Sequence, residues 1–145
     1  MPEGILVDSS TILDIFEDDP TWSEWSVTTL DQCGDTPLLI NPIIYAEVAI
    51  GFERIEELEH AIHRAGFRLV PLPREAAFLA GKALAHYGHS HPTATTSILP
   101  DLLIGAHAAT TALPLITRNP QRVARHFPTV RLITPAVIEP PRPAA

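Results

Sequence analysis

The chain has 145 residues, a formal net charge of -7 at pH 7, and 46% hydrophobic against 19% charged residues. These values indicate one folded domain and exclude a disordered chain. The excess of acids argues against a protein that binds nucleic acid through bulk positive charge. The sequence has no leader-like start and no apolar run near the roughly 20 residues that span a bilayer, and its single Cys33 cannot form an internal disulfide. We therefore expect a cytoplasmic protein that does not contact a membrane.

Short apolar runs alternate with helical patterns along the chain. The runs predict strands at residues 4–7, 38–40, 67–70, 113–117 and 130–133. Helices are expected at 11–16, around Trp22 and Trp25, at 43–50, 53–65 and 74–87, from Pro100 onward, and around Arg122. This alternation predicts an α/β fold with a mostly parallel central sheet and helices on both faces. One domain would occupy residues 1–134, and the Pro-rich tail 135–145 is predicted to be disordered.

Asp8 directly follows the first predicted strand and precedes Ser9 and Ser10. In an open α/β sheet, residues just past the carboxyl ends of strands line the ligand crevice. Asp8 is also a good N-cap for the next helix, although either serine serves equally well. Both interpretations stay open.

Two further acids lie in strongly apolar helical segments. Glu47 is surrounded by the apolar residues of 43–50, and Asp101 lies in the first turn of the helix that follows Pro100. An acid in such surroundings needs a partner. For Glu47 the alternatives are an exposed edge, a buried ion pair, or a metal or catalytic role. For Asp101 the simpler alternative is an N-terminal capping acid, which the helix dipole favours.

Polar residues also follow the fourth predicted strand, at Thr117, Arg118 and Asn119. Turn chemistry is one explanation, because Asn before Pro is common in turns. If Asp8, Glu47 and Asp101 converge in the same crevice, their charges repel and require a cation or shared protons. Ligand sets made only of oxygen favour Mg²⁺ or Mn²⁺ over zinc, and such an ion supports phosphodiester hydrolysis.

The histidines do not form a convincing zinc motif. His60 and His63 lack a third ligand in view, and residues 88–92, with His86 just before them, are interpreted as a mobile His-rich loop that can touch substrate.

Four segments, residues 5–10, 41–48, 98–108 and 115–120, together resemble the PIN-domain proteins, specifically the VapC-type toxin ribonucleases of bacterial VapBC toxin–antitoxin systems. The similarity continues through 127–130 and so covers nearly the whole chain before the tail. Each motif alone is weak, but four in the right order are specific.

The resemblance implies a single PIN-like domain in which Asp8, Glu47 and Asp101 hold Mg²⁺, or Mn²⁺, and the Thr117 hydroxyl orders ligands and waters. Asn119 completes the catalytic set at a position where the family most often has a fourth acid. This departure predicts one well-held metal ion and a weaker second site.

The resemblance also implies an Mg²⁺-dependent endoribonuclease that hydrolyses RNA phosphodiester bonds as a toxin. It further implies a homodimer and a VapB-type antitoxin whose C-terminal segment fills the active-site groove. Candidate antitoxin contacts are Phe16, Trp22 and Trp25, which core packing explains nearly as well. Candidate substrate contacts are Ser9, Arg118, Arg122 and Arg125; the three arginines would meet RNA phosphates, an acidic antitoxin residue or solvent.

Two other functions are weighed against this one. Asn119 and the acidic net charge favour a PIN-fold binding module that has lost catalysis, whereas the three intact acids oppose it. An aspartyl phosphatase would have a second acid where Ser10 stands, and a phospho-receiver domain would have a late lysine, yet none follows Lys82.

Overall fold

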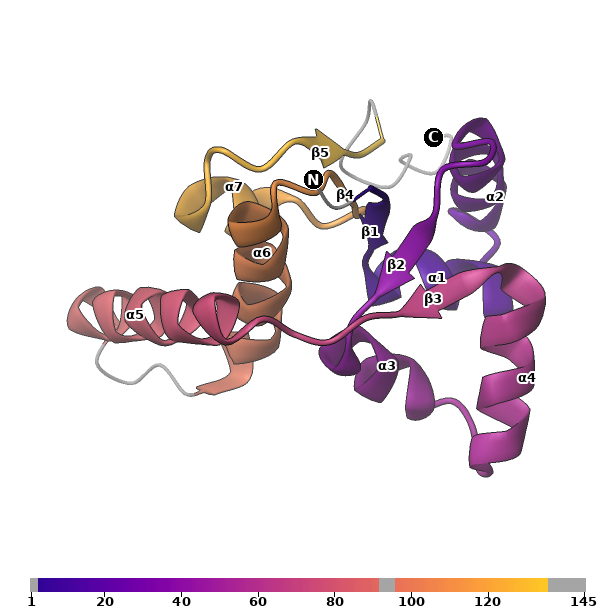
Figure 1. The fold of residues 1–145 in the computed structure, drawn as a ribbon, viewed down its shortest axis with the longest axis horizontal. Helices are drawn as coiled ribbons and strands as arrows, with labels where there is room; N and C mark the ends of the chain where they lie inside the picture. Colours follow the sequence, from indigo (N-terminus) through magenta and orange to yellow (C-terminus); the bar gives the residue numbers. More distant parts are fainter. Residues whose placement is uncertain (1–2, 92–95, 136–145) are drawn as a thin grey trace, which may run out of the picture.

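The computed structural model describes residues 3–91 and 96–135, so the predicted disordered tail lies outside the described residues from 136 onward. Five strands form one sheet in the order β3-β2-β1-β4-β5, and every pairing is parallel (Figure 1). The elements are β1 Ile5–Val7, α1 Ser9–Phe16, α2 Ser23–Gln32, β2 Leu38–Ile40, α3 Pro42–Ala49, α4 Ile55–Ala65, β3 Phe67–Leu69, α5 Arg74–Ser90, a 3₁₀ turn Thr96–Ile98, α6 Leu99–Thr111, β4 Leu115–Ile116, α7 Gln121–His126 and β5 Leu132–Ile133.

The predicted α/β architecture is confirmed. Figure 1 places α5, α6 and α7 to the left of the strands and α2 and α4 to the right. Covered on both faces, the central strands are continuous apolar runs: Leu6, Val7, Leu115 and Ile116 have no exposed surface. None of the helices in the described ranges is long and apolar enough to span a bilayer.

Some predicted boundaries were wrong. The strands expected at 113–117 and 130–133 shorten to two residues each, because Leu113 N–H bonds back to Ala108 and Val130 N–H closes a turn onto Phe127. The loop expected at 88–92 is also corrected: α5 continues through Ser90, and the His91 N–H still donates to the Tyr87 carbonyl at 3.1 Å. Gly88 does not end the helix. Residues 92–95 lie outside the described residues.

The strand order places the site. From β1 the chain adds β2 and β3 on one side and then returns to add β4 and β5 on the other. The boundary between β1 and β4 is therefore a topological switch point, where open α/β sheets bind ligands beyond the carboxyl ends of their strands. Asp8 follows β1 and Thr117 follows β4, so both residues lie at this point.

A buried polar pair joins α3 to α6. Asn41 caps α3 by accepting the N–H groups of Ile43 and Ile44 at 3.0 and 2.9 Å. Its side-chain amide lies 3.0 Å from Nδ1 of His107 on α6, and both residues are buried. Because the Asn41 amide nitrogen can only donate, His107 must accept at Nδ1 and be uncharged. The pair thus ties together the helices that carry Glu47 and Asp101.

This pair predicts a loss of stability in acid. Burial holds the pKa of His107 below its ordinary value of 6.5, so the unfolded chain takes up the proton more readily than the fold. The contribution of His107 to the free energy of unfolding is therefore lost as pH falls through about 6.5 toward the lower folded-state pKa. Urea denaturation at a series of pH values between about 5 and 7 measures the slope.

His107→Asn keeps an acceptor near the position of Nδ1 but does not titrate, so its stability should depend less on pH than that of the wild type. His60→Asn is the matched control, because His60 is exposed on α4. Equal slopes in His107→Asn and in the wild type would show that His107 does not carry this dependence.

The contact between α6 and α7 predicts a second stability effect. A Cβ on Gly105 would lie 2.6 Å from Cδ2 of the buried Phe127 ring. Gly105→Ala should therefore lower the free energy of unfolding by roughly 1–3 kcal/mol, the usual cost of overpacking. On α5, Gly81→Ala meets no atom within 4 Å and should instead raise stability by about 0.5–1 kcal/mol. Stabilisation by both changes in thermal unfolding would contradict the packing described.

Candidate active site

Asp8 is held at the end of the central strand by three hydrogen bonds. Oδ1 accepts the Ser9 N–H at 2.8 Å, and Oδ2 accepts the hydroxyls of Ser10 at 3.1 Å and Thr117 at 2.7 Å. Burial raises the pKa of Asp8 above its ordinary range, and the Asp101 carboxylate adds to the rise, while the three hydrogen bonds oppose it. Asp8 is the N-cap of α1, so the capping interpretation and a place in the site hold together.

Thr117 connects the ends of β1 and β4. Its buried hydroxyl donates to Asp8 and accepts the N–H of Asn119 at 3.0 Å. The expected turn chemistry is therefore present, and it orients the hydroxyl toward the carboxylate. Asn119 is linked to the site through its backbone, while its exposed side chain makes no hydrogen bond with any described residue.

Glu47 reaches the same region from α3. Its Oε1 accepts the Ser9 hydroxyl at 3.0 Å. An acid on so apolar a helix needs a partner, and among the described residues that partner is a serine. Burial raises the pKa of Glu47, and the charges of Asp8 and Asp101 raise it further, against the Ser9 hydrogen bond. Ser9 is itself buried. It connects Glu47 to Asp8 within the site, and the substrate contact expected for Ser9 stays a prediction.

Asp101 projects from the first turn of α6 and pairs with a cation. Arg122 on α7 donates Nη1 to Asp101 Oδ2 at 2.6 Å, with 39% and 46% of the two side chains exposed. An ion pair this exposed contributes about 0–1 kcal/mol to stability. Asp101 is therefore the acidic partner of Arg122. Its charge still raises the pKa values of both other acids.

The donor set suits a hard divalent cation. Glu47 Oε2 and Asp101 Oδ1 accept no hydrogen bond from the described residues, and Asp8 Oδ1 accepts only one. Each carboxylate thus keeps an oxygen able to ligate Mg²⁺ or Mn²⁺. Within residues 3–91 and 96–135, no three His, Cys, Asp or Glu side chains are already grouped closely enough to hold a metal ion. Binding would require these carboxylates to draw together.

Arg118 is not a free cation in this structure. It donates Nε and Nη2 to Asp14 on α1 at 2.8 and 2.9 Å, and it lies 5.6 Å from the Trp22 ring centroid. Ser26 adds a hydrogen bond to Asp14 at 3.2 Å. One edge of the planar guanidinium is thus paired with both oxygens of a carboxylate. It anchors the segment between Thr117 and Asn119 on α1 and α2.

Asp14 was missed by the sequence reasoning, as were Asn41 and His107. A signal for Asp14 was present, because it lies among apolar residues in α1 just as Glu47 does in α3. The aromatic candidates have core contacts: Trp22 is buried, Trp25 packs against the core, and Phe16 meets Phe52 edge-on with ring centroids 6.0 Å apart.

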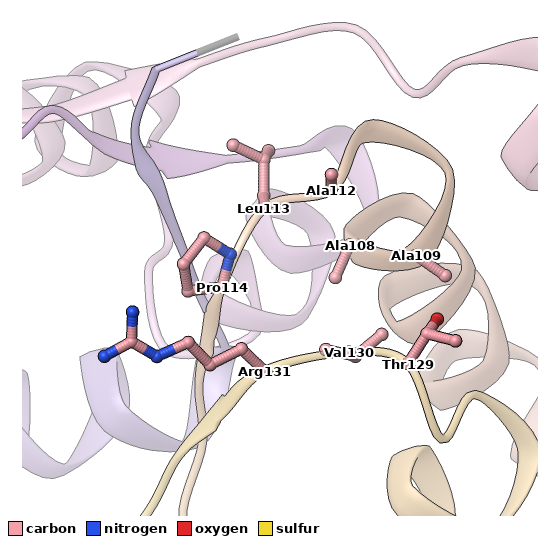
Figure 2. A pocket seen from close by; sticks show the side chains of 8 residues that line it. All are labelled: Ala108, Ala109, Ala112, Leu113, Pro114, Thr129, Val130 and Arg131. Carbon is pink, nitrogen blue, oxygen red and sulfur yellow. The ribbon is translucent and has the colours of Figure 1, made fainter. Parts of the chain in front are cut away.

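A separate cavity of about 390 Å³ lies at the opposite end of β4 (Figure 2). Small apolar side chains from the end of α6 form one wall, and Thr129, Val130 and Arg131 form the other. It contains no acid and no predicted site residue. The candidate site is therefore the group of acids at the switch point.

Solved structures with the same fold come from several bacteria. VapBC2 from Rickettsia felis, bound to a promoter DNA fragment, matches with a TM-score of 0.65 and 17% identity over 90% of this chain and 97% of that chain. A toxin–antitoxin complex from Klebsiella pneumoniae gives 0.61 and 20% over 88% and 95%. FitAcB from Neisseria gonorrhoeae gives 0.60 and 23% over 88% and 95%. No curated protein matches the chain.

A protein-family model also matches most of this chain. The model of the PIN domain matches residues 5–126, which run from β1 to the end of α7 and include all three acids. Strand order, acid positions and this match agree, and the chain belongs to the PIN domain family.

Proposed function

We propose that this protein is a divalent-metal-dependent endoribonuclease that acts in the cytoplasm as the toxin of a VapBC-type pair. The observation that carries the proposal is the electrostatic coupling of Asp8, Glu47 and Asp101 at the switch point of the sheet. Two of these carboxylates have raised pKa values, with only hydroxyl and amide donors hydrogen-bonded to them. A cation would relieve this unfavourable arrangement.

Each residue has a task in this proposal. Asp8, Glu47 and Asp101 would hold the cation, and Thr117 and Ser9 orient the first two of them. A bound Mg²⁺ or Mn²⁺ would supply a water of lowered pKa and offset negative charge on the phosphate. Thr117 donates its hydroxyl hydrogen to Asp8, which favours the ionised form of that carboxylate and fixes its direction.

A protein partner is part of the same proposal. The Klebsiella pneumoniae neighbour is a toxin–antitoxin complex, and the Rickettsia felis neighbour is a VapBC protein on promoter DNA. These similarities support an antitoxin as partner of this chain, and the homodimer stays a prediction from the family resemblance.

The cleavage experiment uses a structured RNA pool with Mg²⁺, with Mn²⁺ and with EDTA. Wild-type protein should cleave only with metal. Asp8→Asn and Asp101→Asn should each lose at least the roughly 10–100-fold that removal of a supporting group at a metal site costs. Gel analysis of end-labelled RNA measures the rates.

Asp35→Asn is the matched control, since it removes one exposed carboxylate from the loop before β2, away from the switch point. It should cleave like the wild type. Equal background cleavage by all four folded proteins, indifferent to metal, would overturn the nuclease proposal.

Asn119→Asp tests the departure from the family pattern. If the side chain can turn toward the acids, a fourth carboxylate should lower the metal concentration for half-maximal cleavage by roughly tenfold, or about 1.4 kcal/mol. Asn119→Ala separates the gain of charge from the loss of the amide. An unchanged metal requirement in Asn119→Asp would show that this position does not reach the metal.

One observation favours a second function. Asn119 stands in place of an acid, and its side chain is exposed and unattached to the described residues. A PIN-fold binding module without catalysis would have these features, and it would bind RNA or antitoxin without metal-dependent cleavage.

A further inference from the structure

A small polar cavity lies beside Asp101. It has a volume of about 190 Å³ and is lined by Tyr87 from α5 and by Gln121, Arg122, Arg125 and His126 from α7. Arg122 belongs to both places, because it lines this cavity and also donates to Asp101. The cavity is therefore adjacent to the group of acids, with Arg122 between them.

The charge in this cavity is positive. Burial lowers the pKa of His126, and Arg125, Arg122 and His86 lower it further. Among the groups that act on His126 in the described part of the chain, none is a carboxylate. Arg125 is exposed and forms no ion pair with a described residue. The cavity is therefore a locally positive region in a chain whose net charge is -7.

One of the residues that line the cavity has a buried polar atom without a partner in the described part of the chain. The Nε2 atom of His126 is buried and has no hydrogen-bond partner among the described residues. Its ring meets the Tyr87 ring in an edge-on contact, with centroids 6.0 Å apart. A buried ring nitrogen without a partner costs stability, so an external acceptor or donor at this position would be favourable.

We propose that Arg125, His126 and Arg122 form a subsite for a backbone phosphate of the RNA, next to the bond that is cut. The inference rests on the proposed nuclease function, because it places the scissile phosphate at Asp8, Glu47 and Asp101. Arg125 supplies a fork of donors for phosphate oxygens, and His126 Nε2 supplies one more when it carries a proton.

The position favours RNA over an acidic peptide. A strand lying on the acids carries a phosphate at every nucleotide, and Arg122 spans the boundary between the acids and the cavity. With Arg118 bound to Asp14, Arg125 is the cation of the predicted arginine set that remains available.

The test measures binding of a short, fluorescently labelled, 2′-O-methylated RNA that cannot be cleaved, with Mg²⁺ and at several salt concentrations. Arg125→Gln should weaken binding roughly five- to tenfold at low salt. It should also reduce the slope of log affinity against log salt by about 0.7, the value for one phosphate contact on a single strand.

Arg64→Gln is the matched control, because it removes the same charge from an exposed position on α4. It should leave the affinity and the salt slope unchanged. As a second readout, NMR titration of the His126 ring in wild-type protein should show its pKa moving upward when the RNA binds, since a nearby anion favours the protonated ring.

The outcomes separate this inference from the nuclease proposal. Equal affinities and slopes for Arg125→Gln and Arg64→Gln overturn the subsite, even if the wild type cleaves RNA. Loss of binding in Arg125→Gln without any cleavage by the wild type supports the subsite and overturns the nuclease. An oligoglutamate peptide that shifts the His126 pKa where RNA does not overturns the choice of RNA.

Discussion

The burial of one carboxylate constrains the rest of the site. Asp8 follows the central strand of a sheet covered on both faces, and withdrawing its charge from water raises its pKa. The hydrogen bonds from Ser9, Ser10 and Thr117 reduce that cost without cancelling it. Carboxylates with strongly perturbed pKa values cluster at functional sites. The Asp101 carboxylate increases the cost, which makes a cation the natural counterpart.

The groups around Asp8 form a support that reaches far across the chain. Thr117 lies on a segment that the Arg118–Asp14 ion pair fixes against α1 and α2. Asn41 and His107 link the helices that carry Glu47 and Asp101. The three acids therefore come from separate elements, and buried polar pairs set the distances between those elements. Such pairs stabilise the fold when every donor and acceptor is hydrogen-bonded, and removing one member lowers the free energy of unfolding.

Part of the fold and of the candidate site could be predicted from the sequence. Apolar strands and isolated acids in apolar segments are local patterns, so the α/β class and the positions of Asp8, Glu47 and Asp101 could be predicted. The partners could not, because Arg118 and Asp14 are 104 residues apart and Asn41 and His107 are 66 apart. Helix ends were also uncertain: Gly88 suggested a stop, but α5 continues to Ser90. The ligand roles of the three acids and of Asn119 stay predictions.

Anomalous scattering from a crystal of the protein soaked in Mn²⁺ tests the central claim most directly. The account predicts one strong peak among the carboxylates of Asp8, Glu47 and Asp101, with the Asp101 oxygen no longer bound to Arg122 alone. The peak should be absent from a matched crystal of Asp8→Asn. A manganese ion bound elsewhere, or none at the switch point in a well-ordered wild-type crystal, would contradict it.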